Sequence, residues 1–156
     1  MKIENLNDLF LHTLQDIYFA EKQIVKALPK MMKKTDSPEL GKAFESHLAE
    51  TEEQVTRLEQ VFEMLGEKPK ATKCPAIEGI IEEANELIAD IQDPDTRDAG
   101  MIAAAQAVEH YEITRYGTLV SWAELLGMKD AAKVLGQTLK EEYGADQKLT
   151  KLAESR

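Results

Sequence analysis

Three glutamates lie in apolar helical stripes, at positions where core side chains are expected. Glu21 shares a helix face with Leu14 and Ile17, because residues spaced by three and four positions lie on the same side of a helix. Glu112 and Glu142 fall within two later stripes in the same way. These three carboxylates are therefore predicted to point into the core.

Further side chains that can bind metal lie close to these stripes. His47 follows Phe44 on the predicted buried side of its helix, and Glu50 lies at the edge of that face. Glu109 and Asp146 each lie about one helical turn from a stripe glutamate. Carboxylates and one imidazole are thus predicted to come from four separate helical segments.

The acidic positions also agree in height along the predicted helices. Glu21 and Glu50 are 29 residues apart, and Glu112 and Glu142 are 30 residues apart. A turn falls near the middle of each interval. Two antiparallel hairpins would therefore bring all four carboxylates to the same level.

Burying several carboxylates together is unfavourable, because removing one ion from water costs several kcal/mol even after relaxation. Like charges nearby raise that cost, so the group must be protonated, paired or bound to metal. Four glutamates carry a charge that two divalent cations would neutralise. Oxygen ligands with one imidazole favour iron or manganese, whereas zinc prefers more nitrogen or sulfur. The sequence therefore predicts two Fe or Mn ions.

The predicted metal ligands are Glu21, His47, Glu50, Glu109, Glu112 and Glu142. Asp16 and Asp146 are further candidates. His47 is equally consistent with a satisfied core histidine, and Glu109 and Asp146 with acceptors that hydrogen-bond the ligands. A single glutamate in a stripe is usually a boundary residue, but convergence of four favours a metal site. Four tyrosines lie within about one turn of the acids: Tyr18, Tyr111, Tyr116 and Tyr143. Most of them are expected to serve packing, although a tyrosine near a di-metal site could hydrogen-bond a ligand or donate an electron.

Four long amphipathic patterns position these residues, and they predict helices over residues 5–33, 38–65, 96–126 and 129–154. Gly66 and Gly127 stand where helices usually end. The connection over 66–97 is long and contains a shorter amphipathic pattern over 77–91. We predict an all-α, ferritin-like four-helix bundle of two antiparallel hairpins joined by a long crossover with a short extra helix. Residues 1–156 are predicted to form one domain.

Composition narrows the classes of partner. Among 156 residues, 29 are acidic and 19 basic, which gives a net charge of −10. Nucleic acid is disfavoured as a partner, because affinity for its backbone comes mainly from Lys and Arg, and an anionic membrane surface is disfavoured likewise. The single cysteine excludes an intramolecular disulfide and suits a reducing compartment. With neither a signal-peptide pattern nor an apolar run of about 18 residues, a cytoplasmic location is predicted.

Several stretches resemble the YciE/YciF family of bacterial stress-response proteins: Ala20-Glu21-Lys22-Gln23, His47-Leu48-Ala49-Glu50-Thr51, Val108-Glu109-His110-Tyr111-Glu112-Ile113, Tyr116-Gly117-Thr118-Leu119 and Leu139-Lys140-Glu141-Glu142. The likeness extends over nearly the whole chain, including Glu78-Gly79 and residues 81–86. It implies a ferritin-like, rubrerythrin-related helical bundle, a homodimer, and a role in bacterial stress responses without a settled activity.

The order of the ligands departs from the di-iron pattern of Glu-x-x-His on each of two helices. His47 precedes Glu50 in the reverse order, and Ala145 stands three residues after Glu142. This departure bears on the full ligand set and on any transfer of ferroxidase chemistry.

Two functions remain open at this point. The first is a di-metal carboxylate protein that acts on peroxide, oxygen or iron during stress. The second is a non-catalytic helical scaffold for dimerisation or partner binding, without metal, whose acids are protonated or hydrogen-bonded. Neither an enzymatic activity nor a catalytic residue is assigned. Iron storage in a shell is less favoured, because nothing in the sequence indicates a cage-forming interface.

Overall fold

The computed structural model describes residues 2–155, and this part of the chain is all-helical. Its helices are α1 (Leu6–Met32), α2 (Pro38–Met64), α3 (Pro75–Asp90), α4 (Pro94–Leu125) and α5 (Lys129–Glu154). The predicted boundaries agree to within about two residues. The helices α3 and α4 begin slightly earlier than predicted, because each starts with a proline in its first turn.

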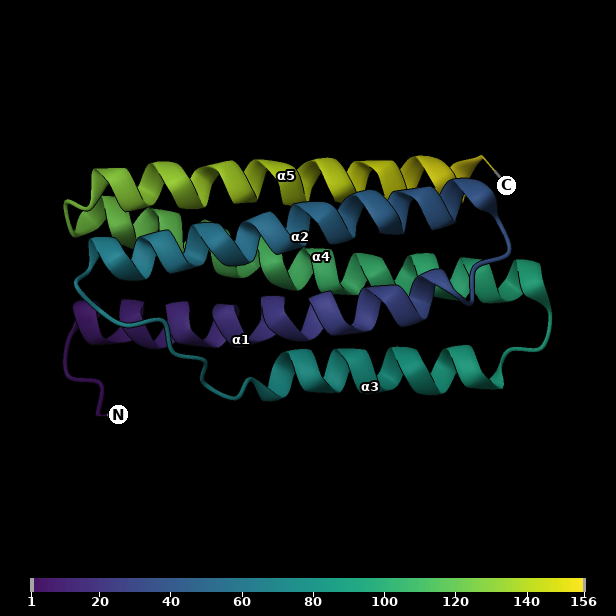
Figure 1. The fold of residues 1–156 in the computed structure, drawn as a ribbon, viewed down its shortest axis with the longest axis horizontal. Coiled ribbons are helices and arrows are strands. Elements are labelled where there is room, and N and C mark those ends of the chain that lie inside the picture. The colour runs from purple at the N-terminus through teal and green to yellow at the C-terminus, as the bar shows by residue number, and fades with distance from the viewer. Residues whose placement is uncertain (1, 156) are drawn as a thin grey trace.

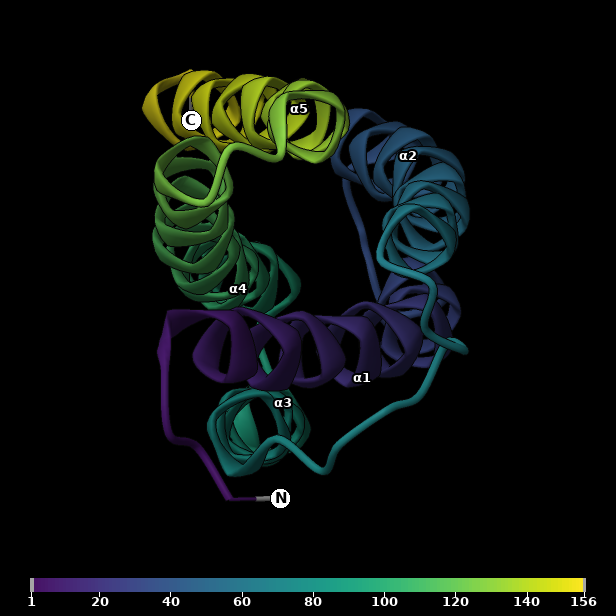
Figure 2. The ribbon, with the colours of Figure 1, turned by 90° about the vertical axis from the view of Figure 1, so that its left-hand side faces the viewer.

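The four long helices enclose one core (Figures 1 and 2). The helices α1 and α2 form one antiparallel hairpin and α4 and α5 form another, while α2 packs on α5 and α1 packs on α4. The connection after α2 returns along the molecule through α3, which lies outside the four on α4 and α1 (Figure 2). The predicted hairpins and the crossover helix are therefore present.

Glycines end α2 and α4 at the same end of the molecule (Figure 1). Gly66 has φ +69° and Gly127 has φ +74°, a region where side chains other than glycine are strained. The residue after each glycine donates its backbone N–H back to the helix, to Phe62 O at 3.0 Å and to Ala123 O at 2.8 Å. These closures turn the chain sharply and fix where each helix stops.

The turn between α1 and α2 is held to α4 by a buried carboxylate. Asp98 is fully buried and accepts hydrogen bonds from the backbone N–H groups of Asp36 at 3.0 Å and Ser37 at 2.7 Å. Ser37 in turn caps α2 with its side-chain oxygen. Asp98 therefore joins the two hairpins at one end of the molecule.

The core is apolar toward both ends of the helices and polar in between. Leu14 and Leu58 toward one end, and Leu40 and Met101 toward the other, are at most 1% exposed, and buried acids interrupt the same helix faces at mid-length. Within residues 2–155, none of the helices combines the length and the apolar character needed to cross a membrane.

Candidate metal centre

Five ionisable side chains from four helices are buried at mid-length of the long helices. Glu21 of α1, Glu112 of α4 and Glu142 of α5 are fully buried, and Glu109 of α4 is 1% exposed. His47 of α2 is 9% exposed. The structure thus buries every stripe glutamate that the sequence singled out.

Helical periodicity places the acids of α4 on one buried face. Glu109 and Glu112 lie on the face that also carries Ala105, Tyr116 and Leu119, all of them buried. These residues are three or four positions apart, which is the spacing of one side of a helix. The apolar residues of this face pack into the core and shield both carboxylates from bulk water.

His47, Glu109 and Glu142 form the tightest part of the centre. His47 Nε2 lies 2.7 Å from Glu109 Oε1. One ligand atom from each of the three residues lies within 4.8 Å of the others. A single cation could therefore contact all three helices α2, α4 and α5 at this point.

Glu21 and Glu112 extend the centre toward α1. Tyr116 donates a hydrogen bond from its hydroxyl to Glu21 Oε2 at 2.9 Å, so of the two roles left open for the tyrosines this one binds an acid. Glu112 lies near enough to Glu21 for the charge of Glu21 to help raise the pKa of Glu112, after burial and Glu142. Because Tyr116 is itself fully buried, it fixes the position of the Glu21 carboxylate.

The pKa values of the four buried glutamates are raised above the ordinary value for glutamate. Burial raises the pKa of Glu21 to about 7 and the pKa values of Glu109 and Glu142 to about 8, and the neighbouring carboxylates add repulsion. Burial, then Glu142 and Glu21, raise the pKa of Glu112 well above its ordinary value. Without a cation, part of the cluster would therefore be protonated near neutral pH.

Several ligand atoms in the cluster have no hydrogen-bond donor or acceptor beside them. The unpartnered buried atoms are Glu21 Oε1, His47 Nδ1, Glu109 Oε2, both carboxylate oxygens of Glu112, and Glu142 Oε2. Within residues 2–155, no lysine or arginine forms an ion pair with these four glutamates. Buried polar atoms are normally satisfied, so this concentration of free lone pairs fits bound cations.

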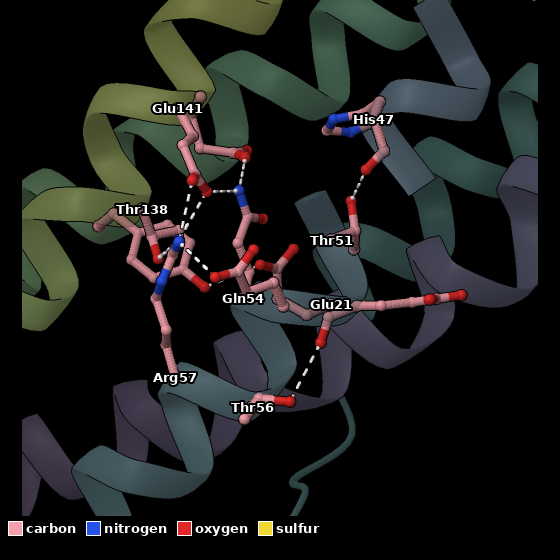
Figure 3. Close-up of polar contacts among 12 residues, drawn as sticks. Glu21, His47, Thr51, Gln54, Thr56, Arg57, Thr138 and Glu141 are labelled. Carbon is pink, nitrogen blue, oxygen red and sulfur yellow. Dashed lines mark hydrogen bonds and ion pairs between the residues drawn. The ribbon is translucent and has the colours of Figure 1, made fainter. Parts of the chain in front are cut away.

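A polar network on α2 and α5 holds Glu142, and the sequence analysis missed it. Gln54 is fully buried and donates to Glu142 Oε1 at 2.7 Å and to Glu141 Oε1 at 3.2 Å. Arg57 makes two contacts with Glu141, at 2.6 and 2.9 Å (Figure 3). The bidentate pair fixes Glu141, which helps to hold Gln54 against Glu142.

A signal for this network was present in the sequence. The buried face of α2 runs from Phe44 through His47, Thr51 and Gln54 to Leu58, in steps of three and four. Thr51 donates within α2, to His47 O at 2.7 Å, which leaves His47 and Gln54 as the polar side chains of this face that reach another helix. The gap in apolar residues between Phe44 and Leu58 marks these positions.

Glu50 lies at the rim of the cluster. It is half-buried and lines a small cavity with His47, Glu109 and Lys148. Burial, then the nearby Glu141, raise the pKa of Glu50. Its role as a ligand stays a prediction, and its position suits a carboxylate at the entrance to the centre.

The two further candidates lie outside the cluster. Asp16 is half-buried and accepts a hydrogen bond from the Tyr111 hydroxyl at 3.1 Å. Asp146 accepts a hydrogen bond from Gln106 at 3.3 Å and lies 3.2 Å from the exposed His110. Both carboxylates have donors of their own, so the geometry favours neither as a ligand.

The fold and the centre define an all-helical protein with a buried group of carboxylates and one imidazole. Residues 5–156 match the family described as a domain of unknown function, DUF892. The chain is 50% identical over 154 residues to Protein YciF of Escherichia coli (strain K12), covering 98% of this chain and 93% of that protein. The chain therefore belongs to the DUF892 family, and its resemblance to YciF-type proteins is confirmed.

Solved structures agree with this assignment. The crystal structure of the E. coli stress protein YciF has a TM-score of 0.93 at 50% identity, covering 97% of this chain and 96% of that one. YcfI of Rhodopseudomonas palustris, a proposed structural protein, has a TM-score of 0.94 at 51% identity, covering 96% and 95%. A protein from Xanthomonas campestris pv. campestris has a TM-score of 0.78 at 24% identity, over 97% and 93% of the two chains, and shares the fold alone.

Proposed function

We propose that this protein is a ferritin-like, di-metal carboxylate protein that takes part in a stress response. The observation that carries the proposal is the set of four buried glutamates with a histidine, in which six ligand atoms lack a partner. The long helices each contribute to this set, as they do in ferritin-like di-iron bundles. The stress role rests on the name of the similar E. coli protein, which is called a stress protein.

The charges of the cluster support two divalent cations. Four ionised glutamates would carry −4 in a region with no cationic side chain paired to them. Two ions of charge +2 would balance the charge of −4 and would offset the cost of burying the four carboxylates. Oxygen ligands with one imidazole favour Fe or Mn over Zn.

The residues divide into two groups around the two ions. His47, Glu109 and Glu142 would hold one ion, because their ligand atoms lie closest together. Glu21 and Glu112 would hold the other. Glu50 would close the shell from the rim of the cluster. Bound Fe or Mn would supply redox chemistry toward oxygen or peroxide.

The surrounding side chains position the ligands and keep water out. Tyr116 orients Glu21 through its hydroxyl, and Gln54 orients Glu142 through its amide. Each of these donors engages one carboxylate oxygen, and the other oxygen of each glutamate is unpartnered. Outer partners of this kind commonly change metal affinity about 10–100-fold when they are removed.

Metal analysis of the purified protein tests the proposal. After anaerobic loading with Fe(II) or Mn(II) and desalting, we expect about two ions per chain, as in di-metal bundles. Glu112→Gln should lose most of this metal, whereas Glu124→Gln, an exposed glutamate of the same helix, should retain it. Fewer than about one ion per chain in the unaltered protein would contradict the proposal.

The second candidate function is a metal-free scaffold for dimerisation or partner binding. The raised pKa values of Glu21, Glu109 and Glu142 favour it, since protonated acids can hydrogen-bond one another without a cation. Thermal melts with and without metal separate the two functions. A melting temperature that metal leaves unchanged favours the scaffold. Association as a homodimer belongs to either function and is measured by sedimentation.

A further inference from the structure

A small pocket lies beside the candidate metal centre, between α1, α3 and α4. Its walls include small side chains from all three helices, Ala27, Ala84, Ala104 and Ala105, together with larger apolar groups. The pocket has a volume of about 30 Å³, counted as the space open to the centres of water-sized molecules. One water-sized molecule needs about 10–15 Å³ on that measure, so the pocket has room for a diatomic molecule.

The pocket reaches the centre itself. His47 and Glu109 line it, and the same two residues form the closest contact of the candidate centre, at 2.7 Å. Each also has a buried polar atom without a partner, His47 Nδ1 and Glu109 Oε2. A molecule in this pocket would therefore lie against the ligands of the proposed metal ions.

The opposite side of the His47–Glu109 pair is lined differently. There a second small cavity, between α2, α4 and α5, carries Glu50 and Lys148 and has the character expected of a route for ions. The α3-side pocket has no charged wall residue other than Glu109, and Asn85 is exposed. Water needs two to four polar partners to occupy a buried site, and among the buried walls of this pocket only His47 and Glu109 supply them.

We propose that the pocket between α1, α3 and α4 is a binding site for dioxygen beside the His47–Glu109 pair. Dioxygen is uncharged, apolar and small enough for the space, whereas a metal ion or a water cluster would find few polar partners there beyond His47 and Glu109. The crossover helix α3 has a defined task in this arrangement, because Ile81 and Ala84 form the outer wall. The consequence for chemistry rests on the proposed function, but the gas site itself does not.

Xenon binding tests the pocket without metal, because apolar cavities bind xenon. In crystals under xenon pressure and by ¹²⁹Xe NMR, the unaltered protein should hold xenon between α1, α3 and α4. Ala84→Leu on α3 and Ala104→Leu on α4 fill the space from two walls and should lose the xenon. Ala89→Leu and Ala103→Leu, at exposed positions of the same helices, should keep it. The Ala104 variant serves if the buried Ala84 variant fails to fold.

The two proposals can fail separately. Metal loading without xenon in the unaltered protein overturns the pocket and leaves the metal centre. Xenon binding without metal loading supports the pocket and overturns the metal centre. With iron loaded, Ala84→Leu should keep its iron but lose rapid uptake of dioxygen. The control Ala89→Leu should take up dioxygen as fast as the unaltered protein. Equal uptake rates for the two variants would overturn the assignment to dioxygen.

Discussion

Two regions of this protein bury carboxylates and treat them in opposite ways. At one end of the bundle, Asp98 is fully buried and receives two backbone hydrogen bonds from the turn between α1 and α2. At mid-length, four glutamates are equally buried, yet most of their oxygens have no donor. Burial alone therefore does not distinguish a structural acid from a ligand.

The difference lies in what compensates each charge. The carboxylate of Asp98 is stabilised by donors that the backbone must in any case satisfy at the start of α2. The oxygens of Glu112 face other acids, whose charges raise the pKa of Glu112 further. An acid with backbone donors supports the fold, whereas an acid without donors requires a proton or a cation.

The largest expected effect is an opposite pH dependence in the metal-free and metal-loaded protein. The pKa values of Glu21, Glu109 and Glu142 are raised to about 7 or 8, so the folded protein holds protons that the unfolded chain releases near its ordinary pKa of 4.5. This contribution to stability is complete below that value and is lost as the pH rises to about 8, by a few kcal/mol.

Bound metal reverses the sign, because its ligands must be deprotonated and binding strengthens as the pH rises. Urea unfolding between pH 5 and pH 8, with and without Mn(II), measures both slopes. If the metal-free protein is equally stable across this range, the acids are compensated like Asp98 and the contrast between the regions disappears.

Removing Asp98 should destabilise the protein without touching metal. Asp98→Ala leaves the backbone N–H groups of Asp36 and Ser37 without their acceptor, at a cost of about 2–4 kcal/mol in the free energy of unfolding. Asp98→Asn retains one acceptor oxygen and should cost less. Urea titration gives the stability and elemental analysis the metal content, and a variant with normal stability would show that Asp98 is not the clamp described above.

Removing the Glu112 carboxylate should have the reverse outcome, with loss of metal and a gain in the stability of the metal-free protein. Glu112→Gln takes away a carboxylate that repels its neighbours, and the free energy of unfolding of the metal-free protein should rise by about 1–2 kcal/mol at pH 8. The exposed control Glu124→Gln should change it by less than about 0.5 kcal/mol. Loss of stability in Glu112→Gln, measured in chelator, would mean that the glutamate supports the fold.

The smallest effect is expected at the ion pair of Arg57 and Glu141. Both side chains are partly exposed. Partial burial acts to raise the pKa of Glu141, but hydrogen bonds from Arg57 and Gln54 outweigh it, so this pKa is lowered. Arg57→Lys breaks the bidentate contact and should cost about 0.5–1 kcal/mol. A double-mutant cycle with Glu141→Gln isolates the pair. The metal dissociation constant of each variant shows whether the pair also positions Glu142 through Gln54.

The local pattern of the sequence predicted much of the candidate centre. Glu21, Glu112 and Glu142 are buried as predicted, because a helix repeats every 3.6 residues and a residue in phase with Leu14 or Leu135 must face the same way. The ends of α2 and α4 followed from Gly66 and Gly127, because the backbone preference of glycine acts within a few residues. These features need no knowledge of neighbouring helices.

Lateral relations between helices were beyond the sequence pattern. The sequence pattern pointed to Glu50 as the side chain of α2 nearest the other acids, whereas Gln54 is the one that contacts Glu142. A stripe assignment does not resolve positions at the edge of a helix face. The backbone donors of Asp98 come from a turn 61 or 62 residues away in the chain. Periodicity determined which residues face inward, and only tertiary packing decided which of them meet, because contacts between helices depend on crossing geometry that no local pattern encodes.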